Sequence, residues 1–400
     1  MTGKKTWNQH VVKKQNKGLV LESIKQNSPI SRADIASSTG LNKGTVSSLV
    51  NELLEEKMID ESGPGESKGG RRPVMLFFNQ VAGYSVGIDL GVNYILGILT
   101  DLRGNIISER TSNFINLTYE EILKELFQVI DTLIKSAPES PYGIVGIGIG
   151  VPGIVNRDEK ILLAPNLGWR NAELKSTLEK KFNVPVTIEN EANAGAYGEK
   201  NFGIGKNNQN IVYVSVGIGI GVGLILNGQL YRGHNGFSGE FGHMTVEVNG
   251  SKCRCGNKGC WELYASEQSL LGNTEQSGNL NLQTDKDHTL ETILDLAQNG
   301  DKEAIQRFQN IGQYLGVGIN NIINIFNPEQ VIIGNRMASA EKWLKEPLND
   351  WIHNQTLWFS QKDLRIDFSH LLTHSTALGV AAFSTEEFLY NNIHKEVTVS

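Results

Sequence analysis

The sequence predicts two units, a small, mainly helical domain over residues 1–80 and a two-lobed α/β body over residues 81–400. Two helical segments separated by a short break occupy residues 31–54, a pattern typical of a small helical domain. Beyond this domain the pattern changes to short β-rich runs separated by helices, which indicates an α/β fold. A glycine-rich strand motif near residue 85 recurs near residue 215, and the repetition predicts two related lobes.

The break between the two helices has the features of a helix-turn-helix. Ser31 can cap the first helix, Gly40 can adopt the left-handed conformation that ends it, and Asn42 can cap the second. The second helix carries an apolar stripe that predicts a buried face: Val46, Leu49, Val50, Leu53 and Leu54. The opposite face carries short polar residues that suit the major groove of DNA: Asn42, Lys43, Thr45, Ser47 and Ser48.

A hairpin wing is predicted after the second helix. Met58 and Ile59 on one side and the apolar run 74–78 on the other flank a glycine- and proline-rich segment. This segment contains Arg71 and Arg72, which can enter a minor groove because its negative potential attracts arginine. The alternative is a flexible linker with solvated arginines. Helix-turn-helix and wing together predict a winged helix-turn-helix domain that binds operator DNA.

Charge is divided unevenly between the two units. The chain has a net charge of −6, and residues up to Phe78 contribute 12 basic and 8 acidic side chains, a net of +4, so the rest carries −10. A basic head on an acidic body predicts that only the head contacts a polyanion. No segment approaches the roughly 20 apolar residues of a membrane span. The lysine-rich start also lacks the apolar run of a signal peptide, so a cytoplasmic protein is expected.

The only three cysteines lie within eight residues, at Cys253, Cys255 and Cys260. This spacing does not suit a disulfide framework, whereas three neighbouring sulfurs can form three corners of a tetrahedron that His243 completes. The sequence therefore predicts a structural zinc ion, and the alternative is three reduced thiols. The zinc site would also fix the orientation of Glu240, just upstream of His243.

The glycine-rich repeat aligns Ser85–Val92 with Ser215–Val222, position by position. Each copy leads to a second strand and then to a turn that contains a glycine, Gly104 or Gly228. Two halves that open in the same way predict duplicated lobes around a cleft. Glycine at such strand ends lets the backbone come close to a ligand, often a phosphate.

In combination, these motifs make residues 81–390 similar to the ROK family, which comprises sugar kinases and transcriptional repressors. The resemblance rests on the cysteine run and on five further segments: Asp89-Leu90-Gly91, Val151-Pro152-Gly153, Pro165-Asn166-Leu167-Gly168-Trp169, Glu189-Asn190-Glu191-Ala192-Asn193 and Gly239-Glu240-Phe241-Gly242-His243. It implies a two-lobed actin- and hexokinase-like (ribonuclease H-like) fold. The winged helix-turn-helix is typical of the repressor branch, and residues 82–105 resemble its xylose-operon members in Gram-positive bacteria.

Three positions depart from the kinases of this family. Val92 and Asn93 stand where the kinases have the Gly and Thr that hold ATP phosphates, and a β-branched residue is hard to fit against a phosphate. Glu191 replaces the aspartate that deprotonates the sugar hydroxyl. A displacement of a catalytic base by about 1 Å can cost about a hundredfold in rate. These departures predict a protein that is not an enzyme and keeps its pocket for binding.

The resemblance also implies sugar contacts from both sides of the cleft: Asn166, Asn190 and Glu191 from one side, and Glu240, His243 and Glu262 from the other. Carboxylates and amides suit the paired donors and acceptors of a sugar. His243 can bind metal through one ring nitrogen and a hydroxyl through the other. By spacing alone, ordinary surface acids would be the simpler interpretation of Glu240 and Glu262.

The expected function is a sugar-responsive transcriptional repressor, at least dimeric, that binds a palindromic operator through paired heads. The resemblance implies D-xylose as the inducer, bound between the lobes, whose closure alters the geometry of the heads. Two alternatives remain: a ROK sugar kinase with a DNA-binding head, and a repressor that senses a phosphosugar or a protein partner. The apolar helix over residues 304–326 is expected either in the subunit interface or inside its lobe.

Overall fold

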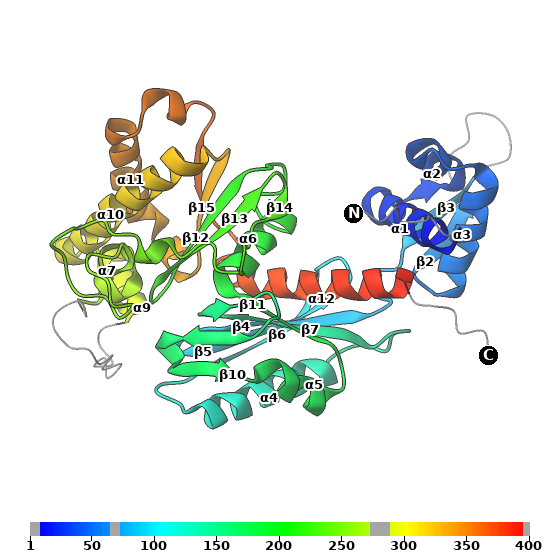
Figure 1. Ribbon diagram of the computed structural model, residues 1–400, viewed down its shortest axis with the longest axis horizontal. Helices are drawn as coiled ribbons and strands as arrows, with labels where there is room; N and C mark the ends of the chain where they lie inside the picture. Colours follow the sequence, from blue (N-terminus) through cyan, green and yellow to red (C-terminus); the bar gives the residue numbers. More distant parts are fainter. Residues whose placement is uncertain (1–8, 65–72, 273–288, 395–400) are drawn as a thin grey trace, which may run out of the picture.

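A helical head, lobe I and lobe II follow one another in the computed structural model, which describes residues 9–64, 73–272 and 289–394 (Figure 1). Lobe I lies in the middle of the elongated molecule, with the head at one end and lobe II at the other. Within these ranges, no helix combines the length and apolar character that crossing a bilayer requires.

The head consists of three helices and a small sheet. Its elements are α1 (Gln9–Asn27), β1 (Ile30–Ser31), α2 (Arg32–Thr39), α3 (Lys43–Glu55), β2 (Ile59–Pro64) and β3 (Val74–Phe78), with the sheet order β1-β3-β2. The predicted helix-turn-helix is confirmed, because Gly40 has a left-handed φ of 73° and Asn42 caps α3 by accepting a hydrogen bond from the Thr45 amide. The antiparallel pairing of β2 with β3 confirms the wing, whereas Arg71 and Arg72 lie outside the described residues.

The apolar stripe predicted for the second helix forms the centre of the head. Val46, Leu49, Val50 and Leu53 are buried, and Leu54 packs at the edge of the same cluster. Helix α1, which the sequence analysis did not identify, covers this stripe with Val20, Leu21 and Ile24.

Lobe I is a five-stranded sheet of order β11-β7-β4-β5-β6. Its strands and helices are β4 (Tyr84–Leu90), β5 (Tyr94–Asp101), β6 (Ile106–Asn113), α4 (Tyr119–Lys135), β7 (Ile144–Val151), α5 (Leu174–Phe182) and β11 (Val186–Asn190). A second, three-stranded sheet follows β7: β8 (Ile154–Val155), β9 (Ile161–Ala164), the 3-10 turn η1 (Pro165–Leu167) and β10 (Trp169–Ala172). Strands β4, β7 and β11 are parallel, so their carboxyl ends lie at one edge of the sheet.

Lobe II repeats this architecture with the sheet order β14-β13-β12-β15-β16. Its strands are β12 (Ile211–Val216), β13 (Ile220–Leu226), β14 (Gln229–Leu230), β15 (Gln330–Gly334) and β16 (Arg365–Phe368). Its helices and 3-10 turns are η2 (Phe241–His243), α7 (Glu262–Ala265), α8 (Glu267–Leu270), α9 (Leu290–Gln298), α10 (Lys302–Phe326), η3 (Arg336–Ala340), α11 (Glu341–Gln355) and η4 (Trp358–Gln361). Helix α10 holds the apolar residues 304–326, and its Phe308, Leu315 and Ile319 are fully buried in the core of the lobe.

The predicted duplication is confirmed, but the residue alignment behind it is wrong. Each lobe has an antiparallel three-stranded meander followed by two parallel strands, yet the first tight turn spans residues 91–93 in lobe I and 217–219 in lobe II. Gly91 therefore corresponds to Gly217, whereas the position-by-position alignment paired it with Gly221. Glycines alternate along 217–223, so a shift by an even number of residues still matches glycine with glycine.

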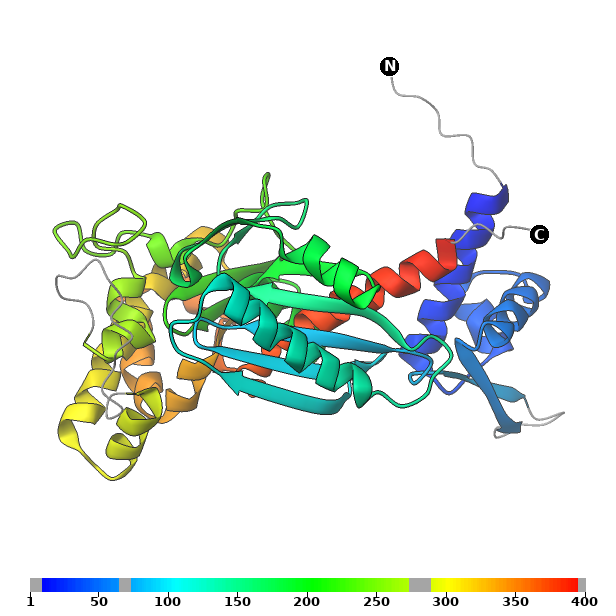
Figure 2. The ribbon, with the colours of Figure 1, turned by 90° about the horizontal axis from the view of Figure 1, so that it is seen from below.

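Two helices lie between the lobes, α6 (Glu191–Asn201) and α12 (His374–His394), and they pack against each other. Helix α12 covers the face of the lobe I sheet opposite α4 and α5, and it runs from the lobe II side to the head (Figures 1 and 2). At its first turn, Thr376 Oγ1 donates a hydrogen bond of 3.1 Å to the Glu191 carbonyl. At its other end, Phe388 and Leu389 join the apolar core of the head.

Candidate functional site

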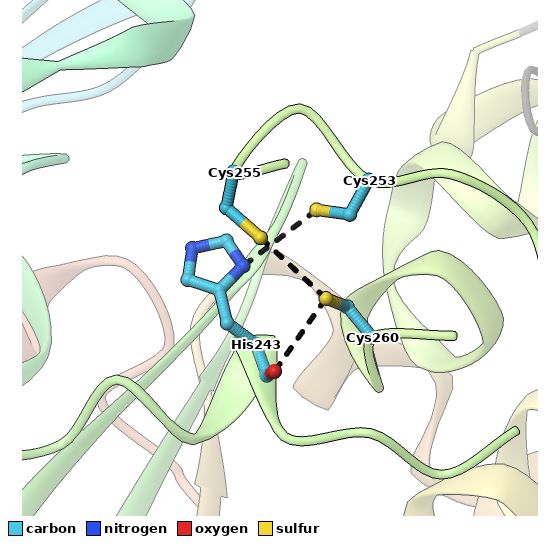
Figure 3. Close-up of side chains that lie close together, drawn as sticks. All are labelled: His243, Cys253, Cys255 and Cys260. Carbon is cyan, nitrogen blue, oxygen red and sulfur yellow. Dashed lines mark hydrogen bonds between the residues drawn. The ribbon is translucent and has the colours of Figure 1, made fainter. Parts of the chain in front are cut away.

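The three cysteines and His243 converge in lobe II, where η2 carries His243 toward the cysteine loop (Figure 3). Their ligand atoms all lie within 4.8 Å of one another. Cys255 Sγ is 3.6 Å from Cys260 Sγ, and Cys253 Sγ is 3.7 Å from His243 Nδ1. A tetrahedral ion with metal–sulfur bonds of about 2.3 Å requires sulfur–sulfur separations of about 3.8 Å. The cluster thus has the donor set and the size to hold a metal ion.

A carboxylate borders this cluster. Glu262, the first residue of α7, places Oε1 3.2 Å from both His243 Nδ1 and Cys253 Sγ. The hydrogen bond with Glu262 raises the pKa of His243 to about 9 in the absence of metal. Glu240 precedes η2 and is exposed, and its negative charge adds to that of Glu262 in raising the pKa of His243.

Lobe I contributes residues at the carboxyl edge of its parallel strands. Asn190 ends β11 and caps α6, because its Oδ1 accepts hydrogen bonds from the amides of Ala192 and Asn193. Its Nδ2 donates to the Gly153 carbonyl at 2.9 Å, which leaves a single N–H donor for a ligand. Glu191 follows as the first, half-buried residue of α6.

Glycines in and just after the turn between β12 and β13 lie close to carboxylates of both lobes. Glu191 Oε1 lies 3.8 Å from the position that a Cβ on Gly221 would occupy. Glu262 Oε2 lies 2.8 Å from the corresponding position on Gly219. The carboxylates of Glu191 and Glu262, which come from the two lobes, therefore approach two glycines that stand two residues apart where β13 begins.

In lobe I, burial is the main cause of the raised pKa values of the carboxyl groups at the site. Burial raises the pKa of Asp89 to about 7, against the opposing effects of its hydrogen bond from Tyr94 and of His374. Burial likewise raises the pKa of Glu191 to about 8, and the negative charges of Asp89 and Glu240 add to the rise. Two neighbouring carboxyl groups with raised pKa values can each accept or donate a hydrogen bond near neutral pH.

Asn166 reaches the site from η1 in lobe I. Its Oδ1 is 3.4 Å from Nη1 of Arg254, which stands between two cysteines in lobe II. A second link joins the lobes where Arg232 Nε donates to Glu189 Oε2 at 2.7 Å. Sequence reasoning identified Asn166 but neither arginine. The position of Arg254 inside the cysteine run was the available signal.

In the head, the predicted DNA-contacting residues lie along the start of α3. Asn42, Lys43 and Ser48 are exposed, and Thr45 and Ser47 are half-buried beside them. The hydrophobic side of α3 faces α1 and α2, so this polar side is the one free to contact a ligand.

Comparison with known proteins identifies the fold and the family. Residues 85–387 match the ROK family, and residues 14–60 match a winged helix-turn-helix DNA-binding family. The chain belongs to the ROK family. It is 48% identical to the xylose repressor of Bacillus subtilis, over 95% of this chain and 97% of that protein. It is 41% identical to the xylose repressor of Caldicellulosiruptor bescii, over 96% and 98% of the two chains.

Among solved structures, a ROK transcriptional regulator homologous to the Escherichia coli MLC protein matches with a TM-score of 0.78 and 29% identity, over 96% of this chain and 98% of that chain. A ROK glucokinase from Streptomyces griseus, in complex with glucose and AMPPNP, matches 76% of this chain and all of its own, with a TM-score of 0.68 and 26% identity. These matches confirm the predicted winged helix-turn-helix followed by an actin- and hexokinase-like ROK domain. The chain is a ROK regulator and not one of the family's kinases.

Val92 and Asn93, which differ from the residues expected of the kinases, lie in the turn between β4 and β5. The side chain of Tyr94 covers this turn. Tyr94 follows Val92 and Asn93, and its ring packs directly on Gly91. The phenol then donates a hydrogen bond of 2.6 Å to Asp89 Oδ2. Sequence reasoning missed this pair, although a tyrosine directly after the altered Gly-Thr position was a signal that the turn had changed.

Proposed function

We propose that this chain is a transcriptional repressor that binds a palindromic operator through the heads of at least two copies and leaves it when D-xylose binds between the lobes. The name of the Bacillus subtilis relative, which aligns over nearly the full length of both chains, supports D-xylose as the signal. The observation that carries the proposal is helix α12, because a single helix contacts both the cleft residue Glu191 and the core of the head. The protein acts in the cytoplasm, with residues 1–80 as the DNA-binding unit and residues 81–400 as the sensor.

The exposed polar side of α3 supports the operator contact. Lys43 and Ser48 lie on the side of α3 that turns away from the head core, where a recognition helix presents side chains to base edges. Two heads must reach half-sites about 34–36 Å apart, or a multiple of that distance. A small rotation between the heads of a dimer therefore prevents simultaneous contact.

The cleft supports a sugar ligand. The carboxylates of Glu191 and Glu262 approach neighbouring glycines where β13 begins, and within the described residues the second amide N–H of Asn190 has no partner. Hydroxyl groups of a sugar can donate to the carboxylates of Glu191 and Glu262 at the same time, so the ligand favours the closed arrangement.

A structural zinc ion fits the lobe II half. Cys253, Cys255, Cys260 and His243 supply three thiolates and one imidazole, the soft donor set that zinc prefers in closed tetrahedral sites. The ion would hold the cysteine loop, next to His243 and Glu262, in one arrangement. This role is structural and involves no chemistry at the metal.

Helix α12 supports a direct route from cleft to head. Tyr142 stacks edge-on against Phe388 of α12, with ring centroids 5.0 Å apart, and its hydroxyl donates to the Glu56 carbonyl at the end of α3 at 2.8 Å. A displacement of α12 at Thr376 is therefore transmitted to the end of the recognition helix. A coupling of about 1–3 kcal/mol between the sites would be typical of such regulators.

The test is fluorescence anisotropy of the full chain on DNA from upstream of its own gene, titrated with D-xylose, D-glucose and xylose phosphate at fixed salt. Fixed salt is required because phosphate contacts make the affinity strongly salt-dependent. We expect tight binding that D-xylose reverses. If no free sugar released the protein from DNA, D-xylose would be contradicted as the signal, whether or not the phosphosugar released it. The assignment of the head as the DNA-binding unit would remain.

Two variants test the DNA-binding residues and the sugar-binding residues separately. Lys43→Ala combined with Ser48→Ala should weaken operator binding and leave D-xylose binding unchanged, whereas Glu191→Gln should do the reverse. ATP turnover by the unmodified protein, measured in the presence of D-xylose, would contradict the assignment as a regulator without kinase activity.

A further inference from the structure

The Asp89–Tyr94 pair lies at the turn between β4 and β5, close enough to Glu191 for the Asp89 charge to raise the pKa of that carboxyl. Asp89 is 1% exposed at the end of β4. Its Oδ2 receives the Tyr94 phenol at 2.6 Å, while no donor among the described residues reaches Oδ1. A buried carboxylate oxygen without a partner is costly, so its persistence indicates a ligand that supplies the donor.

The backbone register places this oxygen beside Glu191. Asp89 pairs with Gly150 in the parallel ladder of β4 and β7, and laterally paired residues share one face of a sheet. A Cβ on Gly150 would lie 3.7 Å from the Cα of Glu191 and 2.3 Å from Thr376 Cγ2. Asp89 therefore points to the face on which Glu191 and the start of α12 lie, and a sugar hydroxyl can contact both carboxylates.

The Tyr94 ring limits the space beside Asp89. Its ring atoms come within 2.1–2.6 Å of the position that a Cβ on Gly91 would occupy, so only glycine at 91 lets the ring lie flat on the turn. Burial and the neighbouring Asp89 charge raise the pKa of Tyr94, which keeps the phenol protonated and bound to Asp89 as a donor. The ring is held from two sides and cannot move aside without breaking this hydrogen bond.

Resting on the proposed function, we infer that Asp89 and Tyr94 select a pentose over a hexose. The free Oδ1 of Asp89 accepts a sugar hydroxyl beside Glu191, and the Tyr94 ring fills the space that an exocyclic hydroxymethyl group would need. D-Xylose in its pyranose ring is D-glucose without that group. A hydroxyl bound at Oδ1 and the phenol oxygen are each one hydrogen bond from the same carboxylate, so they lie at most about 8 Å apart. A hydroxymethyl group on the side of the sugar that faces Tyr94 would meet the ring.

Glu191 adds to the same restriction. The family resemblance places it where the kinases carry a shorter aspartate, and its longer side chain brings Oε1 to 3.8 Å from the position of a Cβ on Gly221. Tyr94, the first residue of β5, and Glu191, the first residue of α6, thus restrict the space beside Asp89 from two elements.

The test is isothermal titration calorimetry of D-xylose and D-glucose with the full-length, zinc-loaded protein. The unmodified chain should prefer D-xylose. Tyr94→Ala should shift the ratio of the two affinities toward D-glucose by about tenfold or more, the range expected for one added group in a pocket. Tyr94→Phe, which keeps the ring, should leave the ratio unchanged. Asp89→Asn should weaken D-xylose binding about tenfold.

Tyr231→Ala is the matched control, since Tyr231 is 49% exposed in lobe II and should leave the ratio unchanged. Should Tyr94→Ala fail to fold, Tyr94→Leu removes the phenol and part of the ring volume while keeping an apolar side chain on the turn. An unchanged ratio in a folded Tyr94→Ala or Tyr94→Leu variant overturns the inference while the proposed function stands. An unmodified protein that binds neither sugar overturns the proposed function itself.

Discussion

Lobe I and lobe II share one sheet topology, yet they build their halves of the cleft in different ways. In lobe I the cleft residues Asp89, Asn190 and Glu191 lie at the end of a strand or the start of a helix, where backbone hydrogen bonds fix them. In lobe II, Glu240 and His243 belong to the short turn around η2, and Glu262 begins the four-residue helix α7. Backbone hydrogen bonds from Val246 to Gly259 and from Trp261 to Met244 join η2 to the end of the cysteine loop, and the cluster of His243 and the cysteines adds a side-chain link. One half of the site is therefore positioned by strand and helix ends, and the other by short turns beside a cluster that could hold a metal ion.

The largest expected difference between the two halves follows from removing one of the metal ligands in lobe II. Cys255→Ser changes an exposed ligand, so the lobe should still fold, but we expect loss of the metal and a fall of about 100-fold in D-xylose affinity. Metal content by mass spectrometry and calorimetry with D-xylose measure both effects. Lys258→Ser, an exposed change in the same loop, is the control. Normal sugar binding by a metal-free variant would show that lobe II holds its half without a metal.

On the lobe I side, Glu191→Gln should weaken D-xylose by about 10–100-fold, because a hydrogen bond to a charged group contributes about 1.5–3 kcal/mol. The same change should raise the melting temperature at pH 8, since it removes a carboxylate whose ionisation burial disfavours. Glu303→Gln, on the exposed surface of α10, should change neither quantity. A loss of bound metal in Glu191→Gln would contradict the independence of the two halves.

Lobe II also depends on how its metal loop is anchored to α10. A Cβ on Gly318 would lie 2.0 Å from Cε2 of Trp261, a fully buried residue between Cys260 and Glu262. Gly318→Ala should therefore destabilise the lobe by about 1–3 kcal/mol and weaken D-xylose binding, as thermal unfolding and calorimetry would measure. Gly18→Ala in α1 meets only an ordinary contact at 3.8 Å, so it should be neutral or stabilising and leave sugar binding unchanged.

The smallest expected effect is a pH dependence that belongs to lobe I. Asp89 and Glu191, with pKa values of about 7 and 8, bind more protons in the folded than in the unfolded chain between about pH 4 and 8, so their contribution to stability falls as pH rises through that range. Sugar hydroxyls that donate to these groups favour the charged form, so D-xylose affinity should rise severalfold from pH 6 to 8.5.

Calorimetry at pH 7.5 in buffers of different ionisation enthalpy should accordingly detect proton release on sugar binding. Glu191→Gln should release fewer protons than the unmodified chain. Proton uptake would contradict donation from the sugar to these carboxyl groups.

Local patterns were the predictable part of the molecule. The helix-turn-helix depends on caps within a few residues, and the metal cluster on ligand spacing in one loop, so both followed from the sequence. Helix α1 was missed because lysines interrupt its apolar positions. The repeat was placed out of register because alternating glycines match at every even shift. The contact of Asn166 with Arg254 joins segments 88 positions apart, a pairing that only the assembled lobes create.

Helix α12 also sets the order in which the molecule can be completed during its synthesis. It covers one face of the lobe I sheet and joins the head core, yet it follows the whole of lobe II in the chain. The strands of lobe I emerge from the ribosome long before the helix that covers them, and the head emerges earlier still. A nascent chain therefore carries a helix-turn-helix that is not yet joined to its sensor, and control by sugar begins only once the last helix has docked.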